Sequence, residues 1–147
     1  MEEAGAVILL GQSGSGKTMT CRAILGLLNS STFQVNGEIL FDNRSLLQLK
    51  GKERALYYGS QIAFVPQNPM TALDPSRKIS VQMAEFLSLH RDLKKKEALS
   101  LYEQAIVRVG LSDTKRVLSS RPYQLSGGML QRCLIALAIA GNAKLVI

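Results

Sequence analysis

The sequence has few of the side chains that build metal sites and disulfide frameworks. It contains two cysteines, Cys21 and Cys133, and a single histidine, His90, among 147 residues. The cysteines are far apart and neither belongs to a CxxC pair, so we expect small buried hydrophobic side chains on helices rather than a zinc site or a disulfide. His90 lies in a polar stretch, which favours a surface position over a role as metal ligand or base.

Long hydrophobic runs are also missing. No stretch approaches the roughly 20 apolar residues that a helix needs to cross a bilayer. The first residues, MEEAGAVILLG, begin with acidic side chains and lead directly into a glycine-rich motif, which is not the pattern of a signal peptide. The sequence therefore predicts a cytoplasmic protein with neither a signal peptide nor a transmembrane helix.

The charge balance is basic, with 18 Lys and Arg against 11 Asp and Glu and a formal net charge of +7. Such a balance suits a polyanionic partner, for example a nucleotide, a nucleic acid or an anionic membrane surface. Much of the charge, however, lies in stretches such as RDLKKKEA (residues 91–98), which are typical of a solvated helix face.

Short apolar runs that alternate with helical patterns predict an α/β fold in about one domain. Residues 6–10 form a continuous apolar run typical of a buried parallel strand, and residues 61–69 predict a second buried strand that two prolines end. Residues 35–42 alternate and predict an exposed antiparallel strand. The last residues, AKLVI (143–147), indicate the start of a third buried strand.

Helical patterns fill the region between Pro75 and Ser120. The strongest is an apolar stripe over residues 98–109, which Gly110 closes as a C-terminal cap. Another helical pattern follows Ser126, where apolar residues fall on one face: Leu130, Cys133, Leu134, Leu137 and Ala138.

The glycine-rich motif GQSGSGKT lies between the first apolar run and a helical pattern. It matches G-x-x-x-x-G-K-[ST], the P-loop, in which glycines let successive backbone N–H groups turn inward around phosphate oxygens. The helix that follows directs its positive N-terminal end at the same point. Lys17 would place a charge on the β- and γ-phosphates, and Thr18 would offer a hydroxyl to Mg²⁺. The motif predicts a phosphate site at Gly11, Gln12, Ser13, Gly14, Ser15, Gly16, Lys17 and Thr18.

The octapeptide LSGGMLQR (125–132) places two glycines directly after a serine that can cap a helix. Glycine weakens a helix by roughly 1 kcal/mol relative to alanine, so an N-cap alone explains Ser126 but not Gly127 and Gly128. LSGGM resembles the signature motif LSGGQ of ATP-binding-cassette (ABC) ATPases. The resemblance implies a head-to-tail pair, in which Ser126, Gly127 and Gly128 contact ATP held by the P-loop of a second ABC ATPase subunit.

Gln67 occupies the place of a third element of the same family, the Q-loop. It follows the apolar residues 62–65 and precedes Asn68 and Pro69. The resemblance implies that its amide binds Mg²⁺, together with Thr18, and borders the attacking water. It also implies that the loop contacts transmembrane permease subunits.

The resemblance covers essentially the whole chain. The segments VNGEILFDNRSLLQL, FVPQNPMTALDP and RPYQLSGGMLQR look most like the peptide and nickel importer branch of ABC ATPases. This branch couples ATP binding and hydrolysis to uptake of peptides or of nickel and other metal chelates, at the cytoplasmic face of the plasma membrane. The fold it implies is a P-loop NTPase with a RecA-like core (1–30, 60–75 and 120–147), a small antiparallel β portion (31–59) and an α-helical subdomain (76–119).

Two departures from the family pattern bear on activity. Met129 replaces the usual Gln of the signature, which leaves backbone N–H contacts possible but changes a side chain near the nucleotide or the second subunit. The family's Walker B Asp and catalytic Glu are absent, because the sequence ends at Ile147 within the strand that should lead to them. We therefore expect an incomplete core sheet and no significant ATP hydrolysis by this chain alone, whether it is a fragment or a truncated gene product.

Two alternative functions remain open at this point. An ABC-type DNA-repair or chromosome ATPase would carry a coiled coil or a zinc module between the Q-loop and the signature. The interval has neither a heptad run nor a CxxC pair, so nucleic acid is not an expected partner. A non-catalytic fragment that binds nucleotide weakly, or not at all, is compatible with the same motifs. The sequence does not specify the cargo, nor a homodimer over a heterodimer.

Overall fold

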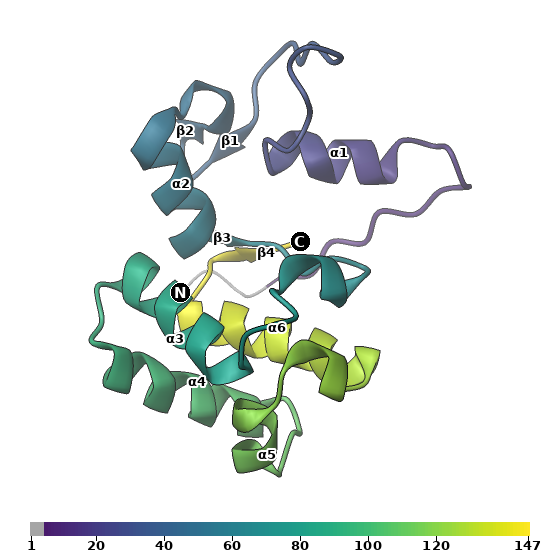
Figure 1. Ribbon diagram of the computed structural model, residues 1–147. Helices are drawn as coiled ribbons and strands as arrows, with labels where there is room; N and C mark the ends of the chain where they lie inside the picture. The colour runs from purple at the N-terminus through teal and green to yellow at the C-terminus, as the bar shows by residue number, and fades with distance from the viewer. Residues whose placement is uncertain (1–4) are drawn as a thin grey trace. The chain divides into compact units, whose positions relative to one another are not determined.

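The computed structural model describes residues 5–147, except for the side chain of Leu56. The chain divides into two compact units, of which the first ends at Leu49 and the second runs from Lys50 to Ile147 (Figure 1). No helix in this described part combines the length and the apolar composition that a membrane span requires.

The first unit contains one helix, α1 (Lys17–Ile24), within its described residues, and a short hairpin. Strands β1 (Leu40–Phe41) and β2 (Arg44–Ser45) pair antiparallel across a two-residue Asp-Asn turn, in which both residues have positive φ. This turn suits the right-handed twist of a hairpin. A short 3-10 helix, η1 (Leu46–Gln48), follows. The expectation of an antiparallel strand within residues 35–42 is confirmed, although the strand covers only its last part.

The strand expected at residues 6–10 does not form, and that prediction is wrong. These residues have no regular secondary structure, and Val7, Ile8 and Leu10 are 90%, 77% and 87% exposed. A buried parallel strand needs hydrogen-bonded neighbours and a covering layer on each face. None of the described strands pairs with this run. Residues 6–10 therefore have the composition of a central strand, but no described strand lies beside them to form hydrogen bonds.

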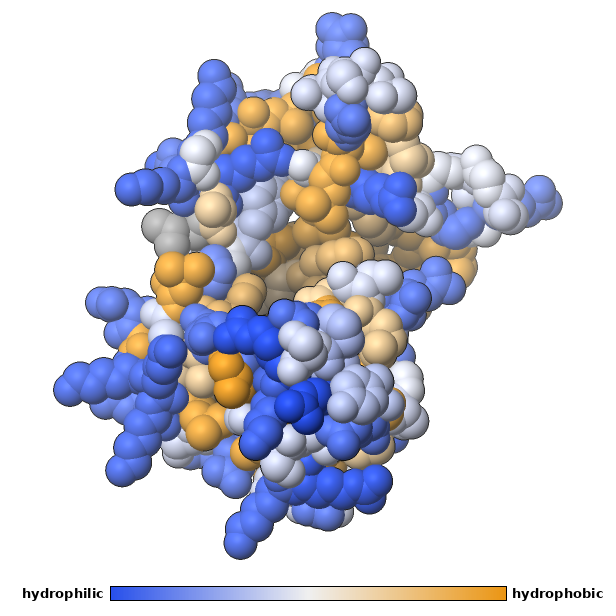
Figure 2. All heavy atoms as spheres, viewed as in Figure 1, coloured by the Kyte–Doolittle hydropathy of each residue, from blue (hydrophilic) through white to orange (hydrophobic). Residues whose placement is uncertain are grey.

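The second unit is mainly helical. Its α-helices and two 3-10 helices are α2 (Gly51–Ser60), η2 (Pro69–Ala72), α3 (Ile79–Arg91), α4 (Lys95–Arg108), α5 (Thr114–Ser119), η3 (Pro122–Gln124) and α6 (Gly127–Gly141). The helices expected between Pro75 and Ser120 are confirmed, and Gly110 ends α4 in the left-handed region with φ 78°. Hydrophilic side chains project from the surface around α3, α4 and α5 (Figure 2), as expected for RDLKKKEA.

The core of the second unit lies where α3, α4 and α6 pack together. The expected face of α6 is confirmed, since Leu130, Cys133, Leu134 and Ala138 are buried and Leu137 is partly buried. The Tyr102 hydroxyl on α4 donates to the backbone oxygen of Cys133 at 3.1 Å, which joins α4 to α6 in the core. Cys133 is thus the small buried side chain that the sequence predicts, while Cys21 on α1 is half-buried.

Two short strands in the second unit pair in parallel. β3 (Ile62–Ala63) lies beside β4 (Leu145–Val146), with Ile62 opposite Leu145. The Val65 N–H extends the pairing by donating to the Ile147 backbone oxygen at 2.8 Å. Strands within residues 61–69 and 143–147 are therefore confirmed, although each covers only two residues and Val146 of β4 is 51% exposed rather than buried. The division into core, β portion and helical subdomain stays a prediction, and α2 occupies part of the range assigned to the β portion.

The surface position expected for His90 is only partly correct, because the side chain is half-buried. Its ring lies beside Phe86, with ring centroids 4.4 Å apart, and fills the space next to Gly59 of α2, where a Cβ would overlap the imidazole. Nδ1 is buried and has no hydrogen-bond partner among the described residues. Burial lowers the pKa of His90 for this reason. Gly59, a costly residue inside a helix, is therefore explained by the imidazole that it accommodates.

Candidate functional site

The glycine-rich loop leads directly into α1 of the first unit. Gly14 and Gly16 have φ values of 85° and 89°, in the left-handed region that glycine adopts without strain. A Cβ on Gly11 would lie 2.5 Å from Ser15 Oγ, so a larger residue there would displace the Ser15 hydroxyl. The loop conformation therefore depends on glycine at positions 14 and 16 of the motif.

Lys17, the first residue of α1, turns its side chain back into this loop. Its Nζ donates to the backbone oxygens of Gly11 and Gln12 at 2.6 and 2.7 Å, and to Ser15 Oγ at 3.2 Å. The ammonium thus lies close to the positive N-terminal end of α1. Because the loop is exposed, phosphate oxygens can reach this ammonium and take over its hydrogens as charge-assisted bonds. This is the chemistry of a phosphate site.

Thr18 is exposed on the first turn of α1, next to Lys17. It offers one neutral oxygen, which fits Mg²⁺, because this ion keeps several waters and takes its other ligands from phosphate. Gln67, the other expected Mg²⁺ ligand, belongs to the second unit.

Ser126 forms the N-cap of α6 in the second unit. Its Oγ accepts a hydrogen bond from the Met129 N–H at 3.3 Å, as a capping serine does. Gly127 and Gly128 are exposed, and a Cβ on either would meet nothing within 4 Å. No contact inside the described chain therefore requires glycine at these two positions. Met129 is half-buried against the core, and its N–H is already used by the cap.

Gln67 is exposed on the loop that follows β3. The next residue, Asn68, fixes this loop from one side, since its Oδ1 accepts from the Met70 N–H at 3.2 Å and starts η2. Beside this segment, the second unit contains a cavity of about 500 Å³. Its lining includes the apolar residues Ala63, Phe64, Leu73, Phe86, Leu89 and Leu137.

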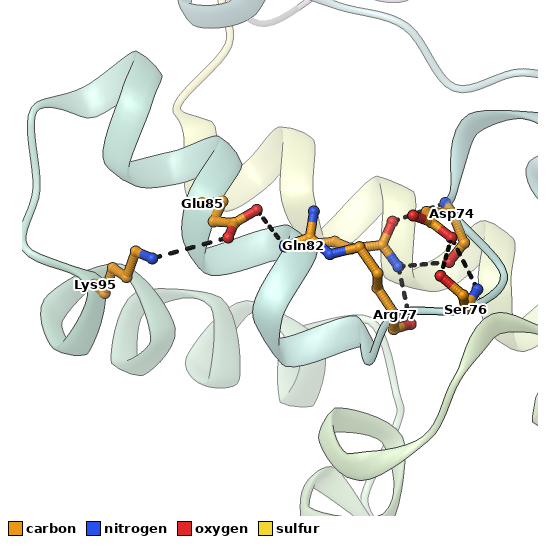
Figure 3. Close-up of polar contacts among 6 residues, drawn as sticks. All are labelled: Asp74, Ser76, Arg77, Gln82, Glu85 and Lys95. Atoms are coloured by element: carbon orange, nitrogen blue, oxygen red, sulfur yellow. Dashed lines mark hydrogen bonds and ion pairs between the residues drawn. The ribbon is translucent and has the colours of Figure 1, made fainter.

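A polar network that the sequence did not reveal holds the turn at residues 74–77 (Figure 3). The Gln82 amide on α3 accepts from the Asp74 N–H at 2.9 Å, and donates to the backbone oxygens of Asp74 and Arg77 at 2.9 and 3.1 Å. Ser76 donates to Asp74 Oδ1 through both its N–H and its hydroxyl, which holds the pKa of Asp74 below its usual value. The tripeptide Asp-Pro-Ser is a turn signal that could have located the turn, but not its partner on α3.

An ion pair adds to this network. Arg77 contacts Glu85 on α3 at 2.6 Å, and Lys95 of α4 lies 3.8 Å from the same carboxylate (Figure 3). The hydrogen bond from Arg77 is the main reason why the pKa of Glu85 is lowered. The turn between the Gln67 loop and α3 is therefore held by side chains of α3.

Comparisons with known proteins agree with the motifs. The family model described as ABC transporter matches residues 1–147. The chain is 44% identical over 139 residues to the metal-staphylopine import system ATP-binding protein CntD of Staphylococcus aureus, covering 95% of this chain and 51% of that protein. It is 40% identical to the oligopeptide transport ATP-binding protein OppD of Lactococcus lactis, covering 95% of this chain and 41% of that protein. The chain thus spans about half the length of these curated relatives.

Solved structures show the same likeness. The dimeric post-hydrolysis structure of the ATP-binding cassette MJ0796 with ADP and Pi matches with a TM-score of 0.76 and 26% identity, over 92% of this chain and 56% of that one. The structure of cbiO1 from Clostridium perfringens matches with a TM-score of 0.69 and 26% identity. This match covers 93% of this chain and 50% of that one. The expected P-loop NTPase fold is therefore confirmed by structural similarity.

Proposed function

The chain belongs to the ABC transporter family, and we propose that it is the ATP-binding part of an importer for peptides or metal chelates. The observation that carries this proposal is the loop from Gly11 to Thr18, where Lys17 and the start of α1 create an exposed positive site. In this role the loop holds the ATP phosphates, Lys17 neutralises the β- and γ-phosphates, and Thr18 provides an oxygen to Mg²⁺. Bound Mg²⁺ would neutralise phosphate charge as ATP is hydrolysed.

The signature residues serve a second ABC ATPase subunit. The positive N-terminus of the 15-residue helix α6 is formed by Ser126, Gly127 and Gly128, which are all exposed. Such a helix end attracts an anion, and the missing Cβ atoms let backbone approach it closely. The likeness to a dimeric cassette supports pairing of two subunits. We propose that the pair is head to tail, so that these residues contact ATP on the other subunit.

The permease is proposed to contact the surface around Gln67. The apolar cavity next to the loop has Leu89 at its rim, which is 69% exposed, so an apolar permease segment gains burial there. The likeness of the Gln67 segment to the Q-loop supports a role for its amide next to Mg²⁺ and the attacking water. Contact with the permease puts the protein at the cytoplasmic face of the plasma membrane, held there by its partner. The relatives named for peptide and metal-staphylopine transport support these two cargo classes.

Calorimetric titration with ATP, ADP and AMP in the presence of Mg²⁺ tests the nucleotide role. ATP and ADP should bind, and AMP should not, because Lys17 recognises phosphates beyond the first. If AMP binds as tightly as ATP and ADP, the loop does not bind the β-phosphate.

A pull-down with the permease tests the contact surface. Leu89→Glu places a charge at the rim of the cavity and should reduce capture of the chain by the permease, without changing ATP affinity. Val107→Glu is the matched control, since Val107 is 57% exposed on α4 and does not line the cavity. Equal capture of both variants would contradict the proposed contact.

A further inference from the structure

A long-range contact joins the turn after Gln67 to the segment before the signature. Arg121 Nε donates to the backbone oxygen of Ser76 at 3.0 Å, across 45 positions of sequence. The preceding residue makes a second link, because the backbone oxygen of Ser120 accepts from the N–H of Ile79, the first residue of α3, at 2.9 Å. Ser120 is buried, so this second link is shielded from water. Two adjacent residues therefore hold both the turn and the start of α3.

Arg121 is also fixed on its signature side. Its N–H donates to Gln124 Oε1 at 2.8 Å, and this bond spans η3. Pro122 and Leu125, which flank the other residues of η3, are buried. The next residue is Ser126, the N-cap of α6. Arg121 and Ser126 are therefore separated only by η3 and Leu125, and Pro122 and Leu125 anchor this short segment in the core.

The turn itself is tied to α3 by the Gln82 amide (Figure 3). Arg121 thus connects the turn at residues 74–77, which side-chain hydrogen bonds hold, to the segment that leads into the capped N-terminus of α6. The Arg121 link is exposed, and water can replace it without leaving a buried group unsatisfied. An exposed link between two fixed segments can open and close at low cost.

We propose that Arg121 is a positioning residue that couples the turn at residues 74–77, which follows the Gln67 loop in the chain, to the signature residues Ser126, Gly127 and Gly128. This inference rests on the proposed function for its consequence, namely that a change at the permease side reaches the helix end that contacts ATP of the second subunit. Closing the link orients the segment that leads into α6, and opening it leaves the buried bond between Ser120 and Ile79 as the remaining one of the two links.

Hydrogen–deuterium exchange on the purified protein tests the link itself. Arg121→Ala should speed amide exchange at residues 74–77 and at residues 126–130 together, by roughly three- to tenfold, the range expected for loss of one hydrogen bond. Arg108→Ala is the matched control, because Arg108 is exposed on α4 and should leave both segments unchanged. Faster exchange at only one of the two segments, or at neither, would overturn the proposal.

General loss of stability is separated from loss of coupling by a second variant. If Arg121→Ala also speeds exchange throughout α4, Arg121→Lys decides, because its ammonium can still donate to Ser76. If amide exchange at both segments is slower in Arg121→Lys than in Arg121→Ala, the result supports coupling. If exchange at neither segment is slower than in Arg121→Ala, the result overturns coupling.

ATP-driven pairing with the second ABC subunit, followed by sedimentation, tests the functional consequence. Arg121→Ala should weaken pairing by a similar factor while the affinity of the P-loop for ATP stays the same. Absence of pairing in the unmodified protein would contradict the proposed function but leave the exchange result valid. If Arg121→Ala pairs as well as the unmodified protein, the coupling role of Arg121 is overturned, but the proposed function is not.

Discussion

At the scale of single residues, the contact between Gly59 and His90 accounts for the conformation of both. Glycine inside α2 leaves room for the imidazole, and the imidazole covers helix backbone that glycine would otherwise leave open. The polar stretch around His90 concealed this contact, because Gly59 lies 31 positions away in the sequence. The buried Nδ1 makes the contact sensitive to protonation.

Acidification should therefore weaken the fold through His90. Below about pH 6.5, the unfolded chain binds a proton at His90, whereas the folded chain binds it only at lower pH because burial lowers the pKa. The free energy of unfolding should then fall as the pH decreases from about 6.5. Urea unfolding at several pH values, compared with His90→Phe, measures this effect, since Phe keeps a ring in the space but cannot titrate.

Other titrating groups limit how this comparison is made. Arg91 and Asp92 line the same pocket as His90. Asp74 and Glu85 have lowered pKa values, so their protonation destabilises the fold at still lower pH. Only the difference between the two proteins reports on His90. Identical pH slopes for the unmodified protein and His90→Phe would show that its protonation does not strain the fold.

Helix α6, at the scale of an element, begins with glycines that no contact among the described residues requires. Gly128 lies inside the first turn of the helix, and its absent Cβ would meet nothing in the described residues. Gly128→Ala should raise the free energy of unfolding by up to about 1 kcal/mol, because alanine favours a helix. The same variant should weaken ATP-driven pairing, because the new Cβ enters the space proposed for the second subunit.

Thermal unfolding and sedimentation of Gly128→Ala measure the two effects. Gly110→Ala provides the contrasting control, because its φ of 78° makes alanine unfavourable by about 1 kcal/mol or more. A loss of stability in Gly128→Ala would mean that Gly128 has a structural role within this chain.

Elements with local patterns could be predicted from the sequence, and elements that depend on neighbours could not. The apolar stripe of α4 and the cap at Gly110 are local, and both are found where the pattern predicts them. The run at residues 6–10 has the composition of a buried strand, but no described strand accompanies it. The link from Gln82 to Asp74 depends on the direction of the Gln82 side chain. The link from Arg121 to Ser76 joins residues 45 positions apart. No local sequence pattern encodes either link.

The whole chain should bind ATP without hydrolysing it. Catalysis of phosphoryl transfer depends on stabilised charge and an oriented water. The described strand β4 carries no carboxylate, and Asp74 and Glu85 are engaged by Ser76 and Arg77. Phosphate release by residues 1–147 should equal that of Lys17→Ala, which serves as the contamination control. Turnover well above this control would mean that another residue of the chain is catalytic.

At the scale of the whole molecule, this chain is proposed to hold ATP with its own P-loop and to offer its signature to a different subunit. Titration of the monomeric chain with a fluorescent ATP analogue, compared across Lys17→Ala and Ser126→Arg, tests both halves at once. Lys17→Ala should lose at least about tenfold in affinity, because it removes a charge-assisted phosphate contact. Ser126→Arg should bind as tightly as the unmodified chain. A loss of affinity in Ser126→Arg, or unchanged binding by Lys17→Ala, would contradict the account.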